Sequence, residues 1–151
     1  MKNKTLICTV GLPRSGKSTW AKQQGVPVVN PDSIRLAIHG QAFIASAEPV
    51  VWAVAKYMVK ALFLAGHDTV ILDATNVSRR RRDEWRSNEW NTVFKVILTE
   101  KEECIRKAVE NKQPELVDVI ERMCRSFEPI GDGEREVEGD IWKGYYDDKA
   151  E

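Results

Sequence analysis

The chain has 151 residues, of which 42% are hydrophobic and 30% charged, a composition typical of one folded domain and not of a disordered or membrane-embedded protein. Its 23 basic and 23 acidic residues balance, so no global field attracts nucleic acid or anionic lipid. Any polyanion would therefore have to bind a local patch.

The cysteines and the N-terminus bear on the cellular compartment. Cys8, Cys104 and Cys124 fit neither a zinc site nor a disulfide framework, and we expect reduced, buried thiols. The basic N-terminus precedes an apolar run of only about six residues, too short for a signal peptide. No run reaches the roughly 20 apolar residues of a membrane span. These patterns predict a cytoplasmic protein.

Along the chain, the spacing of the apolar residues, and the Gly, Pro and polar residues between the apolar runs, predict strands that alternate with helices. The runs expected to be strands are residues 5–10, 26–30, 68–76 and 92–99. The segments expected to be helical are residues 18–24, a helix capped by Asp32 or Ser33, then 49–65, 78–90, 101–111 and 114–127. Strands joined by helices pair in parallel through right-handed crossovers. We therefore expect an α/β three-layer sandwich, with a parallel sheet of about four to five strands and helices on both faces.

The string GLPRSGKS, residues 11–18, matches the phosphate-binding loop G-x-x-x-x-G-K-[ST] between a strand and a helix. Glycines let backbone N–H groups turn toward an anion, and the helix N-terminus adds partial positive charge. Lys17 would contact the β- and γ-phosphates, and Ser18 would ligate Mg²⁺. The residues expected to bind the nucleotide are Gly11, Pro13, Arg14, Ser15, Gly16, Lys17, Ser18 and Thr19. The cofactors are then ATP and Mg²⁺, in a single P-loop NTPase-type kinase domain over residues 1–151.

The class of nucleotide enzyme follows from what is missing. GTPases carry N-K-x-D, and the nearest string, NKQP at residues 111–114, lacks the aspartate. A motor or AAA-type ATPase would need a longer chain and an acidic pair, whereas this chain offers only VILDAT at residues 70–75. A small kinase remains.

Polar residues follow the predicted strands and supply candidate catalytic groups. The carboxyl ends of parallel strands meet at one rim, where sites form. Asp32 is placed to accept the proton of an acceptor hydroxyl, or to cap a helix. Arg35, one helical turn later, can hold an acceptor phosphate. Asp73 either holds water on Mg²⁺ or caps a strand, and Asn76 either orients a loop or touches the acceptor.

The run SRRRRDEWR, residues 78–86, is the densest basic patch of the sequence. It is either a polyanion site or a solvated helix face, and Arg79 is its member that we predict to contact the substrate. Trp85, beside the arginines, is a candidate platform for base stacking. Trp20 and Trp52 are expected to lie in the core.

The strings GLPRSGKSTWAK, NPDSIR and DATNVSRRRR together resemble, in order, the 5′-kinase domain of bacteriophage polynucleotide kinase and its P-loop relatives, including zeta-toxin-like kinases. The resemblance implies that Lys17 and Ser18 bind ATP·Mg²⁺, that Asp32 is the general base and that Arg35 contacts the acceptor phosphate backbone. The segment Thr75–Asn76 also matches and is predicted to bind substrate.

The chain departs from the family at two places. The phage enzyme reads D-T-N where this chain has Ala74, so Asp73 stands one position early as a magnesium ligand. The family's lid arginine has no clear match, and its candidates are Arg106, Lys107 and Lys112.

The leading hypothesis is transfer of the γ-phosphate of ATP to a hydroxyl on nucleic acid, with DNA as partner. The acceptor is either a 5′-hydroxyl end or the hydroxymethyl group of 5-hydroxymethyluracil in DNA. The alternatives are a small-molecule kinase acting on a nucleoside or sugar, favoured by the zero net charge, and a nucleotide-binding regulatory module with little turnover.

Overall fold

The computed structural model describes residues 3–41 and 43–139. Its strands are β1 (Thr5–Val10), β2 (Val28–Val29), β3 (Thr69–Leu72) and β4 (Asn91–Val96). Its helices are α1 (Lys17–Gln23), α2 (Pro31–His39), the short 3₁₀ turn η1 (Ala45–Ala47), α3 (Glu48–Leu64), α4 (Arg79–Asp83), α5 (Lys101–Glu110) and α6 (Leu116–Arg125). No helix within these ranges is long and apolar enough to cross a membrane.

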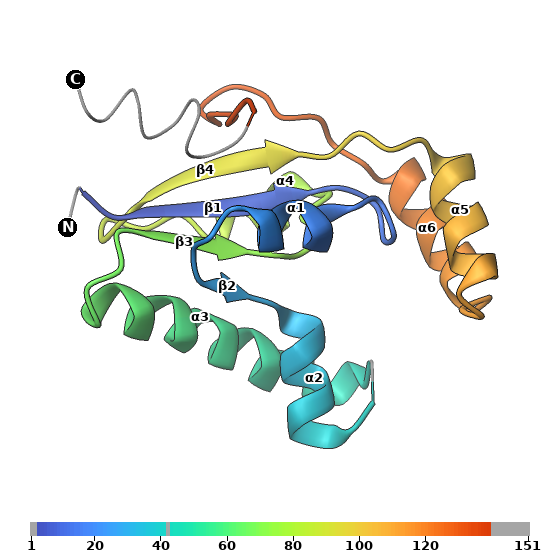
Figure 1. Cartoon of the computed structure of the whole chain (residues 1–151), viewed down its shortest axis with the longest axis horizontal. Coiled ribbons are helices and arrows are strands. Elements are labelled where there is room, and N and C mark those ends of the chain that lie inside the picture. The colour runs from blue at the N-terminus through green and yellow to red at the C-terminus, as the bar shows by residue number, and fades with distance from the viewer. Residues whose placement is uncertain (1–2, 42, 140–151) are drawn as a thin grey trace.

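The four strands form one parallel sheet in the order β2-β3-β1-β4, so the first strand lies in the middle (Figure 1). All residues of β1 and β3 are buried, as expected for strands covered on both faces. Leu6, Cys8 and Val10 face the core under α2 and α3, whereas Ile7 faces α1. The predicted three-layer α/β sandwich of the P-loop NTPase type is confirmed.

Helices α5 and α6 form a hairpin beyond the carboxyl ends of β1 and β4 (Figure 1). Their contact is a small apolar cluster of Cys104, Ala108 and Ile120, to which the chain adds Leu12 from the loop after β1. The hairpin is thus joined to the main core at the proposed nucleotide loop.

Several sequence expectations are corrected. The second strand is only Val28–Val29: it ends there because Asn30 is the N-cap of α2, and before it Pro27 has no N–H to donate to a sheet partner. The arginine-rich helix ends at Asp83, since the Trp85 carbonyl accepts hydrogen bonds from Trp90 Nε1 and Thr92 Oγ1 in place of a helical partner.

Two burial expectations were also wrong. Trp85 is only 2% exposed, so it cannot stack on a base. Cys124 is exposed, whereas Cys8 and Cys104 are buried, and all three thiols are free. Trp20 is buried as predicted, and Trp52 is half-buried against the same core as Trp85.

The fully buried Arg82 side chain connects the segment after α6 to the turn that follows β3. Its Nε donates to Glu134 Oε2 at 2.7 Å, and its other nitrogens donate to the carbonyls of Asn76 and Pro129. Burial raises the pKa of Glu134, but the bond from Arg82, the Gly131 N–H and the nearby guanidinium charges outweigh it and hold that pKa below its usual range. Arg82 therefore serves the fold.

Arg82→Ala should lower the free energy of unfolding by about 3 kcal/mol or more, because it leaves the Glu134 carboxylate buried without its partner. Urea denaturation followed by tryptophan fluorescence measures this. Arg80→Ala, on the exposed side of the same helix, should stay within about 0.5 kcal/mol of wild type. Equal losses in both variants would contradict the anchoring role.

Candidate active site

The conformation of the loop between β1 and α1 depends on two glycines. A Cβ on Gly11 would lie 2.8 Å from Ser15 Oγ and 2.9 Å from the Ile97 carbonyl oxygen, so only glycine fits there. Gly16 has φ 103°, a conformation that side chains rarely adopt, and it stands at the N-cap of α1. The Gly11 N–H donates to the Thr75 carbonyl at 2.9 Å, which fixes the loop against the turn after β3.

Lys17 is buried and points back into this loop. Its Nζ donates to the Leu12 carbonyl at 2.6 Å and lies 3.4 Å from Ser15 Oγ. Burial lowers the pKa of Lys17, while the carboxylates of Asp73 and Asp32 favour its charged form. The ammonium group thus sits where the loop's backbone would hold an anion.

Ser18 and Asp73 meet at the carboxyl ends of the strands. Ser18 Oγ donates to Asp73 Oδ2 at 2.6 Å, and Asp73 is only 6% exposed. A hydroxyl and a carboxylate are oxygen ligands of the kind that Mg²⁺ prefers. No group of three His, Cys, Asp or Glu side chains suited to a metal occurs in the described part of the chain, so phosphate and water would complete the shell. The pair fits the expected Mg²⁺ of a phosphoryl-transfer site.

Asn30, which the sequence analysis missed, joins this pair to α2. Its Oδ1 accepts from the N–H groups of Asp32 and Ser33, and its Nδ2 donates to Asp73 Oδ2 at 3.1 Å. Neither Asp32 nor Ser33 is the cap. The string NPDS did hold the signal, because asparagine followed by proline is a strong N-cap and first-turn pair.

Asp32 and Arg35 lie together on the first turns of α2. Arg35 NH1 donates to Asp32 Oδ1 at 2.7 Å, while its Nε and NH2 hold both oxygens of Glu48. The Glu48 hydrogen bonds raise the pKa of Arg35, although burial acts against them. With 76% of its side chain exposed and no capping duty, Asp32 has a carboxylate open to a substrate.

Two other predicted acceptor residues, Asn76 and Arg79, form hydrogen bonds within the protein. Asn76 is buried, has φ 45°, and its Nδ2 donates to the Thr9 carbonyl, so it shapes the turn after β3. Arg79 turns the other way: its NH2 donates to the Asp132 carbonyl and its NH1 lies 3.6 Å from Glu134. Their contacts with an acceptor, like that of Thr75, stay predictions.

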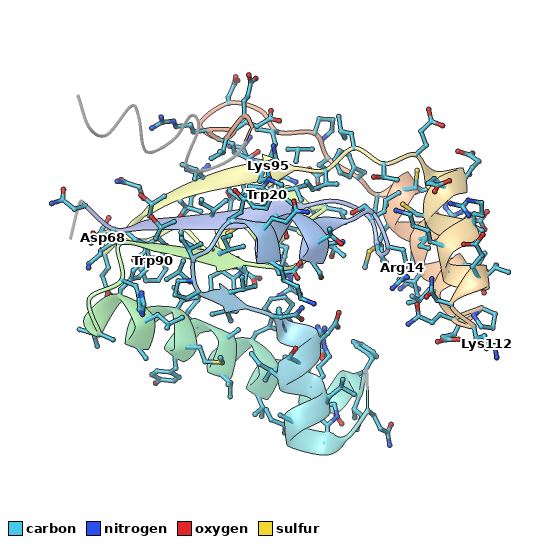
Figure 2. All side chains as sticks on the ribbon, viewed as in Figure 1. Arg14, Trp20, Asp68, Trp90, Lys95 and Lys112 are labelled. Carbon is cyan, nitrogen blue, oxygen red and sulfur yellow. The ribbon has the colours of Figure 1, made fainter. Side chains whose placement is uncertain are left out.

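The lid candidates are spread along the α5–α6 hairpin. Arg106 forms ion pairs with Glu103 and Glu110 on its own helix. Lys112 lies at the tip of the hairpin with φ 58°, at the end of the hairpin beyond Arg14 in the view of Figure 2. None of the hydrogen bonds and ion pairs described for this hairpin joins Arg106 to the nucleotide loop.

Residues 6–130 match the family model AAA_33, described as an AAA domain. The chain belongs to this family. Its resemblance to P-loop kinases is confirmed by the structures that it matches. An AAA-type motor was not expected from the sequence. The family description carries the AAA name, and the structures that the chain matches support the kinase interpretation.

Among solved structures, one of a Pnkp1/Rnl/Hen1 complex matches with TM-score 0.62 and 30% identity over 69% of this chain and 38% of the other. A Pnkp1/Rnl/Hen1 RNA repair complex matches with TM-score 0.63 and 21% identity over 91% and 51%. A gluconokinase from Sinorhizobium meliloti 1021 matches with TM-score 0.61 and 16% identity over 97% and 88%. This chain thus spans about half or less of the first two chains. The sequence has no significant match among curated proteins.

Gly11→Ala should weaken ATP binding at least tenfold, because the added methyl group must displace Ser15 or the backbone at Ile97. Isothermal titration with a non-hydrolysable ATP analogue measures it. Gly131→Ala is the control, since a Cβ there meets only ordinary contacts. Unchanged affinity in Gly11→Ala would show that the loop does not form the nucleotide site.

Asp73→Asn should raise the Mg²⁺ concentration needed for half-maximal phosphate transfer by about tenfold or more, because it removes the charged oxygen ligand beside Ser18. The measurement is a Mg²⁺ titration at saturating ATP. Asp68→Asn, an exposed aspartate just before the same strand, should leave the titration unchanged. An unaltered Mg²⁺ requirement in Asp73→Asn would leave strand capping as its role.

Proposed function

We propose that the protein transfers the γ-phosphate of ATP to a hydroxyl group on nucleic acid. The observation that carries the proposal is the Asp32–Arg35 pair, which stands on the same rim of the sheet as Lys17 and the Ser18–Asp73 pair. The 30% identity to a chain of the Pnkp1/Rnl/Hen1 complex supports a polynucleotide acceptor, RNA or DNA.

Each group of residues at this site has its own role in phosphate transfer. Lys17 and the loop N–H groups would hold the β- and γ-phosphates, and Ser18 and Asp73 would hold Mg²⁺, which would neutralise charge on the phosphates. Asp32 takes the proton of the acceptor hydroxyl as the oxygen forms its bond to the γ-phosphorus. The bond from that phosphorus to the β–γ bridging oxygen breaks, and ADP leaves with the electron pair.

The ion pair between Asp32 and Arg35 couples binding of the acceptor phosphate to release of the general base. An acceptor phosphate that binds Arg35 NH1 displaces the exposed Asp32 carboxylate from it, while Glu48 keeps the rest of the guanidinium in place. The freed carboxylate then faces the hydroxyl. Asn30 keeps α2, and with it Asp32, at a fixed position relative to Asp73.

A second candidate is a kinase of small molecules such as a sugar. The gluconokinase structure aligns over nearly the whole of both chains, whereas the Pnkp1 chains extend well beyond the matched part. The balanced charge of the chain agrees with this candidate as well. The two functions differ in the acceptor alone.

Transfer of labelled phosphate from ATP·Mg²⁺ should separate the acceptors. The set is a 5′-hydroxyl RNA, a 5′-hydroxyl DNA, a 5′-phosphorylated DNA with internal 5-hydroxymethyluracil, and a mixture of nucleosides and gluconate. We expect label on a nucleic acid. Label on gluconate or nucleosides alone would move the assignment to a small-molecule kinase.

In the same assay Asp32→Asn should lower kcat by about 10²–10⁴-fold, because the amide cannot take the proton, with ATP affinity unchanged. Ser33→Ala, one residue later on α2, is the matched control. If Asp32→Asn kept full biological activity while Lys17→Ala abolished it, the protein would be a nucleotide-binding regulator and not a kinase.

A further inference from the structure

We propose that Arg81, held on the face of Trp52, is a second phosphate-binding position of the acceptor site, next to Arg35, and that it binds the backbone of a nucleic-acid acceptor. The inference rests on the proposed nucleic-acid kinase function. It assigns one arginine of the basic run to the substrate and adds Trp52, which the sequence analysis expected to serve only the core.

The arginines of residues 79–86 divide between two faces. Arg79, Arg82 and Arg86 all bind the segment that follows α6, through the carbonyls of Asp132, Pro129 and Gly133 and the Glu134 carboxylate. Arg81 points the other way, toward α3. The basic run is thus neither a single polyanion patch nor a uniformly solvated face.

Trp52 brings Arg81 to the acceptor residues. The Arg81 Cζ lies 4.5 Å from the centroid of the Trp52 ring, and the Arg35 Cζ lies 5.7 Å from the same centroid. Glu48, which accepts hydrogen bonds from Arg35 Nε and NH2, holds the Arg35 guanidinium beside this ring. A continuous line of contacts therefore runs from Asp32 through Arg35 and Trp52 to Arg81.

The position is rigid and still accessible. Trp52 packs against the buried Trp85 with ring centroids 6.2 Å apart, which holds its indole in place. The Arg81 side chain is 40% exposed, and its ion pair is with the exposed Glu84 on its own helix, 3.0 Å away. Because an exposed pair of this kind contributes little, a phosphate can replace Glu84. A guanidinium stacked on an aromatic face keeps its edge N–H groups for such a ligand.

Other charges around the position set its sign. Lys56 lies over the Trp85 ring at 5.3 Å and donates to the Glu84 carbonyl, which adds positive charge on the α3 side. Both Arg35 and Arg81 help to hold the pKa of Glu48 below its usual range, the Arg35 hydrogen bond being the larger cause. The carboxylates here are those of Asp32, Glu48 and Glu84. Glu48 is already bonded to Arg35, and an anion that displaces the exposed Asp32 and Glu84 carboxylates would meet the cations. This favours an anion.

A second phosphate position discriminates between acceptors. Arg35 binds the phosphate nearest the reacting hydroxyl, and Arg81, further along the same line of contacts, binds one that only a longer strand supplies. A nucleoside or a sugar has no group for it. The position therefore ties the chain to a polymeric acceptor.

Arg81→Ala tests this with Arg80→Ala as matched control, since Arg80 is an exposed arginine on the same short helix. With a 5′-hydroxyl oligonucleotide, Arg81→Ala should raise KM for the acceptor about tenfold, with KM for ATP unchanged, while Arg80→Ala should match wild type. With a nucleoside 3′-monophosphate, which carries one phosphate, both variants should match wild type. Arg81→Lys should recover part of the loss, because it keeps the charge but not the planar fork.

The salt dependence of oligonucleotide binding gives a readout that a structural role would not move. Loss of one phosphate contact should reduce the slope of log K against log salt by about 0.7 in Arg81→Ala. If wild type phosphorylates oligonucleotides and Arg81→Ala has the KM and the slope of Arg80→Ala, the second position is overturned and the proposed function stands. If wild type phosphorylates only small molecules, both are overturned.

Discussion

The parallel pairing of β1 with β3 is the constraint on which the candidate site depends. The register sets Cys8 against Leu72, so β1 runs two residues beyond the end of β3 and the loops that follow both strands lie at the same edge of the sheet. The buried Thr9 hydroxyl, which bonds the Leu72 and Ala74 carbonyls and accepts from the Ala74 N–H, locks the turn that follows β3. Two segments 55 residues apart in the chain are thereby held close enough for Ser18 to bond Asp73.

Helix α2 is tied to this strand pair by one side chain. Asn30 uses its carbonyl oxygen to cap the helix and its amide nitrogen to bond Asp73, so the proposed general base and the proposed magnesium ligand share a support. A rigid support of this kind favours catalysis because reacting groups must be held within a fraction of an ångström. The capping role of Asn30 also accounts for the end of the second strand at Val29.

The α5–α6 hairpin reaches the nucleotide loop by two contacts. Leu12 enters the hairpin's apolar cluster, and the Thr99 hydroxyl donates to the Ser15 carbonyl at 2.6 Å. A ligand that changes the conformation of the loop would therefore also change the contacts that position the hairpin. Sequence spacing alone could not choose among the lid candidates Arg106, Lys107 and Lys112, because the hairpin's orientation is set by this small cluster and not by local propensity.

The sequence by itself determined the layout of strands and helices, the phosphate-binding loop and the polar strand ends, because periodicity, Gly11, Gly16 and Asp73 are local signals. What only the tertiary structure decided is how these groups divide their contacts. Arg79 and Arg82 serve the fold while Arg81 faces Trp52, and Trp85 is buried where a stacking platform was expected. The physical reason is that successive helical residues point in different directions, and the partners that select among them, such as Glu134 and Trp52, lie about 30 to 50 residues away in the chain.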